Sequence, residues 1–177
     1  MPTACFLLPE FSGHINPSLA LAAHLTKSGW RVHYLSSNVF QAAILGSGAT
    51  FDDERDAAPT LCAPKDDGER PGYFEAWERF RRANAETRDR PWWEGRAHIE
   101  NQVTLEKLPG TVSWMRKKAP DVVVYCNFFC RVGQLAALVL DVAHVARCRV
   151  GTDDAAKAYR RREGLRNSWS PPRPCGP

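Results

Sequence analysis

Several patterns that identify common functions are missing from this sequence of 177 residues. Its six cysteines include no C-x-x-C pair, which argues against a zinc site, and there is no G-x-G-x-x-G or G-x-x-x-x-G-K-[ST] loop to cradle the phosphates of a cofactor. No apolar run approaches the ~18 residues of a membrane span, and no Lys or Arg precedes the first apolar stretch, as a secretory signal would require. We therefore expect a reduced, cytoplasmic protein with no metal, no cofactor and no transmembrane segment.

The positive charge of the chain is concentrated at its C-terminal end. Residues 147–177 hold eight Lys or Arg against three Asp or Glu, whereas residues 1–146 carry a net charge of −1. The end is also rich in proline and lacks apolar periodicity, so we expect a basic, irregular tail over residues 147–177 behind one domain formed by residues 1–146. Positive charge alone, without an arrangement of aromatic residues to stack on bases, does not indicate a nucleic-acid partner. We therefore expect no nucleic-acid partner.

The first fifty residues alternate between short apolar runs and helical patterns. An apolar run without polar alternation is typical of a strand that is covered on both faces. The order of the predicted elements is a strand at Thr3–Leu8, a helix from about Pro17 to Gly29, a strand at Arg31–Ser36, a helix at Asn38–Leu45 and a strand that begins at Ala49. This rhythm predicts an α/β fold, a Rossmann-like parallel sheet with helices on both faces.

The second half of the domain is more polar and then returns to the same rhythm. We expect an exposed loop at Asp52–Gly72, a helix at Tyr73–Arg90 interrupted at Pro91-Trp92-Trp93, and a second helical stretch from Ile99 to Met115 with a break or kink at Pro109-Gly110. The pattern ends with a strand at Val122–Tyr125, a helix at Val132–Leu140 and a strand at Val142–Val145.

The segment from Pro9 to Pro17 is predicted to be a loop between the first strand and the first helix. Ligands of open α/β sheets bind at the carboxyl ends of the strands, where this loop lies. Gly13 permits a close approach of backbone, and His14 is the side chain there that can accept a proton near neutral pH. The alternative interpretation is a histidine that caps the helix or bonds to backbone.

The same segment, F-S-G-H-I-N-P at residues 11–17, belongs to a longer pattern. It is followed by L-T-K-S-G-W-R-V at residues 25–32, G-A-T-F at residues 48–51 and A-P-D-V-V-V-Y at residues 119–125. Over residues 3–145 the chain resembles the N-terminal, acceptor-binding domain of UDP-glycosyltransferases of the GT-B fold, the macrolide-glycosyltransferase type in particular. The resemblance implies a hydrophobic small-molecule acceptor, with sugar transferred from a nucleotide sugar to its hydroxyl group with inversion.

The resemblance also implies roles for individual residues. His14 would be the general base, and the acceptor would lie against Phe11, Ser12, Gly13, Ile15 and Asn16. Phe128 and Phe129, after the fourth strand, could line the acceptor pocket, although adjacent aromatic residues are as often part of a core.

Two features depart from the family pattern. Cys126 stands where the family has an Asp that pairs with the histidine, and a neutral thiol cannot stabilise an imidazolium as a carboxylate does. No segment resembles the C-terminal donor domain, so a nucleotide sugar would bind only if a donor domain is supplied. We therefore expect a truncated glycosyltransferase-like protein that is inactive alone. The alternatives are an inactive module that binds a small molecule or a protein, and the acceptor subunit of a split glycosyltransferase.

Overall fold

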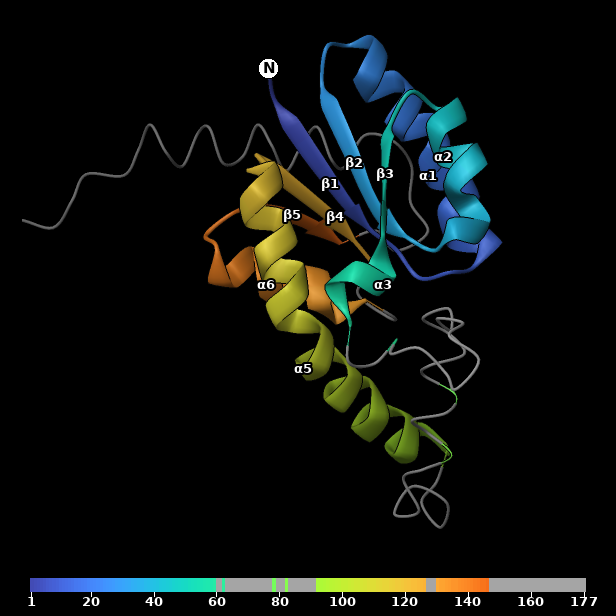
Figure 1. Ribbon diagram of the computed structural model, residues 1–177, viewed down its shortest axis with the longest axis vertical. Coiled ribbons are helices and arrows are strands. Elements are labelled where there is room, and N and C mark those ends of the chain that lie inside the picture. The colour runs from blue at the N-terminus through green and yellow to red at the C-terminus, as the bar shows by residue number, and fades with distance from the viewer. Residues whose placement is uncertain (60–61, 63–77, 79–81, 83–91, 127–129, 147–177) are drawn as a thin grey trace, which may run out of the picture.

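The fold is a parallel β-sheet with helices packed on both of its faces (Figure 1). The computed structural model describes residues 1–59, 62, 78, 82, 92–126 and 130–146. Its five strands lie in the order β3-β2-β1-β4-β5, and all neighbours pair in parallel. The strands are β1 (Thr3–Leu7), β2 (Arg31–Ser36), β3 (Thr50–Asp53), β4 (Val122–Tyr125) and β5 (Ala143–Ala146).

The central strand β1 is buried on both faces and paired along both of its edges. Its five residues are all buried, because one face of the sheet is covered by the N-terminal helices and the other by the later ones. Leu7 pairs with Leu35 of β2 on one side and with Tyr125 of β4 on the other. At the opposite end of β4, Asp121 accepts a hydrogen bond from the backbone N–H of Thr3 at 2.8 Å, which fixes the register of the two strands.

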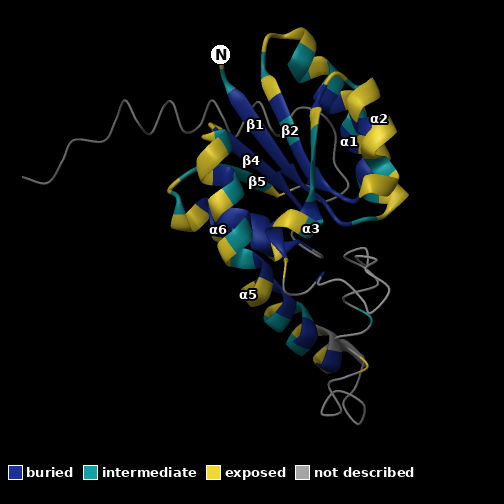
Figure 2. Cartoon of the chain, viewed as in Figure 1, coloured by how far each residue is buried: buried dark blue, intermediate teal, exposed yellow. Residues whose placement is uncertain are grey.

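Helices cover both faces of the sheet, whose central strands are buried (Figure 2). Each face has its own apolar cluster. Phe6 and Tyr34 face the first group of helices, and Cys5 and Leu35 face the second. The first group is α1 (Ser12–Lys27), the short 3₁₀ helix η1 (Asn38–Phe40) and α2 (Gln41–Gly46), and the second is α3 (Glu54–Ala57), α5 (Trp92–Lys118) and α6 (Arg131–Val139). The α/β architecture predicted from the sequence is confirmed. Among the described helices none is both long and apolar enough to cross a membrane.

Helix α1 begins five residues earlier than the sequence predicted. Phe11 has an extended backbone and its carbonyl accepts hydrogen bonds from His14 N at 2.8 Å and Ile15 N at 3.0 Å, so the chain is helical from Ser12 onward. Pro17 therefore lies inside α1, where it lacks the N–H that would bond to the carbonyl of residue 13. The prediction of a loop up to Pro17 was wrong, because proline is compatible with the early turns of a helix as well as with its first residue.

The segment after β3 and the long helix α5 also differ from the prediction. The expected loop that starts at Asp52 contains the last residues of β3 and then α3, whose first turn is capped by the Asp53 carboxylate accepting from Arg55 N at 2.9 Å. Helix α5 runs without a break from Trp92 through Pro109 and Gly110. Glycine is required at residue 110, because a Cβ atom there would collide with the carbonyl group of Ala57 in α3.

Some predictions concern residues that the structure does not describe. Most of the expected loop, nearly all of the expected helix at Tyr73–Arg90 and the whole expected tail at residues 147–177 fall there. The strand expected at Val142–Val145 is confirmed as β5, one residue further along the chain.

Candidate functional site

The candidate site lies at the carboxyl ends of the two central strands. Leu7 and Tyr125 are paired in the register of β1 and β4, so the segment that leads into α1 and the residue that follows β4 leave the sheet at the same edge. His14 lies in the first turn of α1, and Cys126 directly follows β4. The structure thus brings the predicted base and the residue at the family's acid position to one edge of the sheet.

His14 is half-buried in a turn whose other residues are mostly open to solvent. Its ring lies beside that of Phe11, with the ring centroids 6.1 Å apart. Phe11, Ser12, Gly13 and Asn16 are exposed, and a Cβ atom added at Gly13 would meet nothing within 4 Å. The first N–H groups of a helix have no acceptor within the helix, so this exposed turn can bind oxygen atoms.

Ile15 differs from its neighbours, because its side chain is fully buried in the core cluster beneath α1. Helical geometry accounts for this: once α1 starts at Ser12, residues 15 and 18 share its inner face. The predicted contact of Ile15 with an acceptor stays a prediction. Phe128 and Phe129 lie outside the described residues.

Cys126 is a buried thiol whose surroundings include a second cysteine. Its carbonyl accepts a hydrogen bond from the backbone N–H of Cys130 at 2.9 Å, and both side chains are free thiols. Burial raises the pKa of Cys130 far above its usual range, so that thiol is neutral at pH 7. In the part of the chain that the structure describes, no group of three or more His, Cys, Asp or Glu side chains is arranged to hold a metal ion.

The structure adds three ionisable residues that the sequence did not single out: Glu10, Glu54 and Lys107, which we call the carboxyl cluster. Glu10 precedes α1, Glu54 begins α3 and Lys107 comes from the middle of α5. The Lys107 ammonium donates a hydrogen bond to Glu54 Oε2 at 2.8 Å, and both side chains are buried. Burial opposes the charge of Lys107, but the charges beside it, that of Glu54 above all, offset this and raise its pKa.

Glu10 is the unusual member of the carboxyl cluster. Burial raises its pKa from 4.5 to about 9, and a side-chain hydrogen bond with Glu54 and the negative charge of Glu54 act in the same direction. Glu10 is therefore a neutral carboxylic acid at pH 7. A sequence signal existed for both acids, because each follows a strand at its carboxyl end, but nothing in the sequence showed that they meet.

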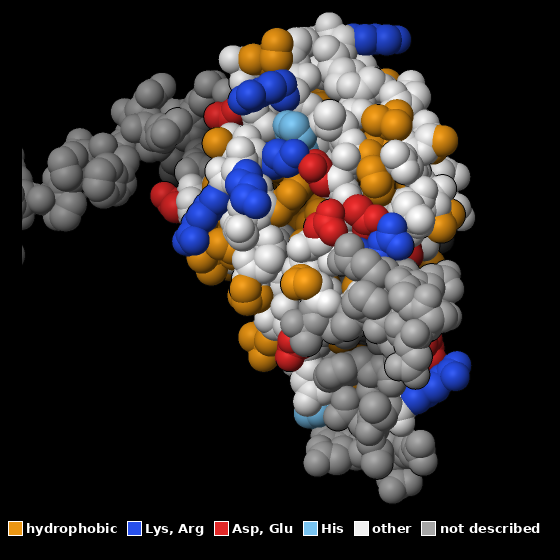
Figure 3. All heavy atoms as spheres, in the orientation of Figure 1, with side chains coloured by type: hydrophobic (Ala, Val, Ile, Leu, Met, Phe, Trp, Pro, Cys, Tyr) orange, Lys and Arg blue, Asp and Glu red, His pale blue; other side chains and the backbone are white. Residues whose placement is uncertain are grey.

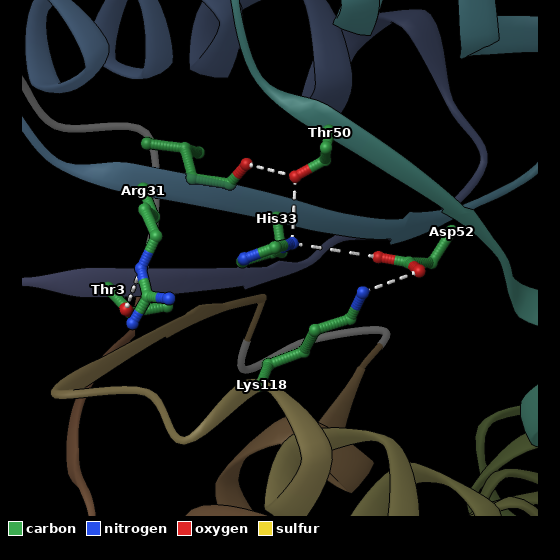
Figure 4. Close-up of polar contacts among 7 residues, drawn as sticks. Thr3, Arg31, His33, Thr50, Asp52 and Lys118 are labelled. Carbon is green, nitrogen blue, oxygen red and sulfur yellow. Dashed lines mark hydrogen bonds and ion pairs between the residues drawn. The ribbon is translucent and has the colours of Figure 1, made fainter.

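A second polar group, which we call the sheet-face network, lies on the side of β2 and β3 that faces the end of α5 (Figure 4). Lys118 donates to Asp52 Oδ1 at 2.8 Å, and Asp52 Oδ2 lies 3.8 Å from His33 Nδ1. The hydroxyl of Thr50 lies 2.7 Å from the same ring nitrogen. Burial, followed by the charge of Lys118, lowers the pKa of His33 below 6.5. Figure 3 shows acidic and basic side chains and a histidine together at the surface of this face.

Comparisons with known proteins identify the class of fold. No family model matches the sequence, and no curated protein matches it significantly. Solved structures of glycosyltransferases do match it. SsfS6 of Streptomyces sp. SF2575, complexed with thymidine diphosphate, matches with a TM-score of 0.53 and 18% identity, over 83% of this chain and 38% of that chain. SnogD from Streptomyces nogalater matches with a TM-score of 0.52 and 21% identity, over 82% of this chain and 34% of that chain. The spinosyn rhamnosyltransferase SpnG, complexed with spinosyn aglycone, matches with a TM-score of 0.50 and 19% identity, over 82% of this chain and 34% of that chain.

At these identities the likeness shows the fold. The chain has the Rossmann-like α/β fold of the N-terminal part of a GT-B glycosyltransferase, and it spans about a third of the length of the glycosyltransferases it matches. The resemblance inferred from the sequence is confirmed at this level.

Proposed function

We propose that this chain is the acceptor-binding part of a sugar-transferring enzyme and holds a hydrophobic small molecule with a free hydroxyl group. The observation that carries the proposal is the position of His14 in an exposed helical turn directly after the central strand. In open parallel sheets this is the edge at which ligands bind. Two of the similar structures hold the two kinds of molecule that such a transfer needs, a nucleoside diphosphate and an aglycone.

In the proposed reaction His14 is the general base. An alcohol is a weak nucleophile, and a positioned imidazole that removes its proton contributes about 10²–10⁴-fold to the rate. The acceptor oxygen then forms a bond to the anomeric carbon of a nucleotide sugar, the bond from that carbon to the diphosphate breaks, and the nucleoside diphosphate leaves with the electron pair. Attack from the face opposite the leaving group inverts the configuration of the sugar.

We further propose that the chain alone transfers no sugar. Cys126 takes the family's acid position, and a thiol does not stabilise a charged imidazole as the family's carboxylate would. Transfer also requires that both substrates be held together, and no segment of the sequence resembles a donor-binding domain. We place the protein in the cytoplasm, because Cys5, Cys126 and Cys130 are free thiols.

Binding measurements test the acceptor role directly. Isothermal titration calorimetry of the full chain with polyketide aglycones that include spinosyn aglycone should give saturable binding, and thymidine diphosphate alone should give none. Phe11→Ala removes an exposed aromatic ring beside His14 and should weaken binding several-fold. Leu138→Ala is the matched control, since Leu138 is exposed on α6, and it should change nothing. If thymidine diphosphate bound and none of the aglycones did, the acceptor role would be contradicted.

The proposed lack of activity has its own test. The chain, mixed with thymidine diphosphate-linked sugars and an aglycone that binds, should release no thymidine diphosphate and yield no glycoside by mass spectrometry. Turnover that disappears in His14→Gln would overturn the claim of inactivity while leaving the acceptor role intact.

A further inference from the structure

Two buried hydroxyl groups join α1 to the sheet just behind the candidate site. Ser18 lies in the second turn of α1 and Tyr34 lies in β2, and both residues are fully buried. Their side-chain oxygen atoms are 2.7 Å apart, and the Ser18 hydroxyl also donates a hydrogen bond to the Ile15 carbonyl at 2.6 Å. The contact between Ser18 and Tyr34 therefore fixes the helix against the strand, and its effect reaches the backbone of the first turn.

The direction of both hydrogen bonds follows from the chemistry of the three groups. A carbonyl oxygen can only accept, so the single hydrogen of the Ser18 hydroxyl is donated to Ile15. The Ser18 oxygen is therefore the acceptor in its contact with Tyr34, and the Tyr34 hydroxyl is the donor. The result is a directed chain of hydrogen bonds from Tyr34 through Ser18 to the Ile15 backbone, which we call the hydroxyl chain.

Tyr34 gives the hydroxyl chain a rigid support. Its ring stacks on that of Phe6 in the central strand β1, with the ring centroids 4.7 Å apart and an angle of 22° between the ring planes. Phe6 and Tyr34 are also partners in the register of β1 and β2. The sheet thus determines where the Tyr34 hydroxyl lies, and that hydroxyl in turn determines where the Ser18 side chain lies.

The first turn of α1 has less support of its own than an ordinary helix start. Phe11, its N-cap residue, has no side-chain oxygen to accept from the first N–H groups, and the turn contains no acidic residue. Pro17 lacks the N–H that would bond to the carbonyl of Gly13. A hydrogen bond that comes from outside the backbone ladder therefore contributes more here than it would in a well-capped helix.

The hydroxyl chain meets the first turn at the Ile15 carbonyl. The N–H of Ile15 donates to the Phe11 carbonyl at 3.0 Å, and the N–H of His14 donates to the same carbonyl at 2.8 Å. The backbone of Ile15 is thus bonded on both sides, through its N–H to Phe11 and through its carbonyl to Ser18. Because His14 is covalently joined to Ile15, fixing Ile15 also fixes the backbone from which the His14 side chain extends.

We propose that Ser18 and Tyr34 are positioning residues, which hold the first turn of α1, and with it the backbone of His14, in a fixed place above the sheet. The Tyr34 hydroxyl acts through the hydrogen bond that it donates, in addition to the apolar area that its ring buries. The functional meaning of this arrangement rests on the proposed role of His14 as a general base. The arrangement itself is testable without any substrate.

Amide hydrogen exchange of the full chain, followed by nuclear magnetic resonance, tests the proposal. Ser18→Ala removes both hydrogen bonds of the hydroxyl chain, so the amides of His14 and Ile15 should exchange about 2- to 10-fold faster, the factor that one hydrogen bond contributes. This factor is measured relative to the change at the Leu21 amide, because a general loss of stability would speed exchange at Leu21, a buried residue further along α1, by the same amount.

Thr26→Val is the matched control. The Thr26 hydroxyl lies near the other end of α1, where it donates to the carbonyls of Ala22, Ala23 and Ser47. Valine keeps the shape of the side chain and removes the hydroxyl, so the exchange of His14 relative to Leu21 should not change. The ring Cε1–H resonance of His14, identified by its loss in His14→Gln, should move in Ser18→Ala and keep its place in Thr26→Val.

A second variant keeps the proposal falsifiable if Ser18→Ala does not fold. Tyr34→Phe retains the ring that stacks on Phe6 and removes only the hydroxyl that donates to Ser18. The amides of His14 and Ile15 should again exchange faster relative to Leu21, and the His14 ring resonance should move.

Two results would overturn the proposal: relative exchange at His14 and Ile15 that is unchanged in the variant that folds, or an equal increase in Thr26→Val. Neither result depends on an acceptor. A failure of the proposed function, seen as no binding of any aglycone by the unmodified chain, is therefore distinguished from a failure of the positioning role.

Discussion

Helix α5 forms two lysine–carboxylate ion pairs with the region around β3, and the pairs differ in their surroundings rather than in their length. Lys107–Glu54 and Lys118–Asp52 both have an N–O distance of 2.8 Å. The side chains of the first pair are 5% and 3% exposed, and those of the second are 23% and 26% exposed. The first pair is shielded from solvent, whereas the second is partly open to it and has His33 Nδ1 3.8 Å from Asp52 Oδ2. The same contact is therefore structural at one end of the helix and replaceable at the other.

Removing each lysine should show this difference most strongly. Lys107→Met leaves the Glu54 carboxylate buried without its partner and should lower the free energy of unfolding by about 3–5 kcal/mol. Lys118→Met leaves a partly exposed Asp52 that water can solvate and should cost about 0–1 kcal/mol. Urea unfolding followed by tryptophan fluorescence gives both values. Equal losses would mean that burial does not distinguish the pairs.

The second-largest expected effect is on the pH dependence of the free energy of unfolding, to which Glu10 beside the buried pair contributes. Folding raises the pKa of Glu10 from its reference value of 4.5 to about 9, so between pH 4.5 and pH 9 the folded chain binds more protons than the unfolded chain. The stability that this proton supplies is present in full below pH 4.5 and is lost as the pH rises through 9, at about 1 kcal/mol per pH unit. Unfolding of the unmodified chain and of Glu10→Gln between about pH 6 and pH 9 measures the difference. Parallel curves would show that Glu10 is ionised in the folded protein.

The packing of α5 against α3, which holds the buried pair in place, can be tested without altering a charge. Gly110→Ala places a methyl group against the carbonyl of Ala57 and should destabilise the fold by about 1–3 kcal/mol. Gly46→Ala, with nothing within 4 Å of the added carbon, should be neutral or stabilising by up to about 1 kcal/mol. Thermal unfolding of the two variants gives the comparison, and a Gly110→Ala variant as stable as Gly46→Ala would show that α5 is not held close to α3.

The smallest expected effect is in the sheet-face network. Burial and Lys118 lower the pKa of His33 below 6.5, while Asp52 opposes this. Stability supplied by a neutral folded His33 is present above pH 6.5 and is lost as the pH falls toward its folded pKa. Titration of the His33 ring by nuclear magnetic resonance should show a higher pKa in Lys118→Met and a lower one in Asp52→Asn. Shifts in the reverse directions would mean that these charges do not reach His33.

The strands were predictable because each carries its own signal. Val122–Tyr125 is a fully apolar run that parallel sheets bury on both faces, and the structure has β4 at the same residues. The start of α1 was not predictable from Pro17, because the cap is provided by the backbone of Phe11 and leaves no side-chain signature. His14 was identified through the resemblance of the sequence, and its half-exposed position in a helical turn could come only from the structure.

The carboxyl cluster shows why a site can be missed even when its fold is predicted. In α5 the apolar Leu105 is 65% exposed and the charged Lys107 is buried, the reverse of what the polarity of the two side chains indicates. Which face of α5 is inside depends on its contact with α3, through Gly110 and Ala57, and α3 itself was not predicted. Glu10 and Glu54 meet only once β1 and β3 are aligned in one sheet. Contacts between residues so far apart in sequence leave no local pattern.

The central claim, that an acceptor binds at the first turn of α1, is tested most directly by mapping where an aglycone contacts the folded chain. Two glycine amides serve as reporters in ¹H–¹⁵N spectra recorded with increasing spinosyn aglycone: Gly13 beside His14, and Gly46 at the end of α2. The account predicts that the Gly13 amide shifts with a saturable dependence on aglycone concentration while the Gly46 amide does not move. Saturable shifts confined to α6 or α2, with Gly13 unchanged, would contradict it.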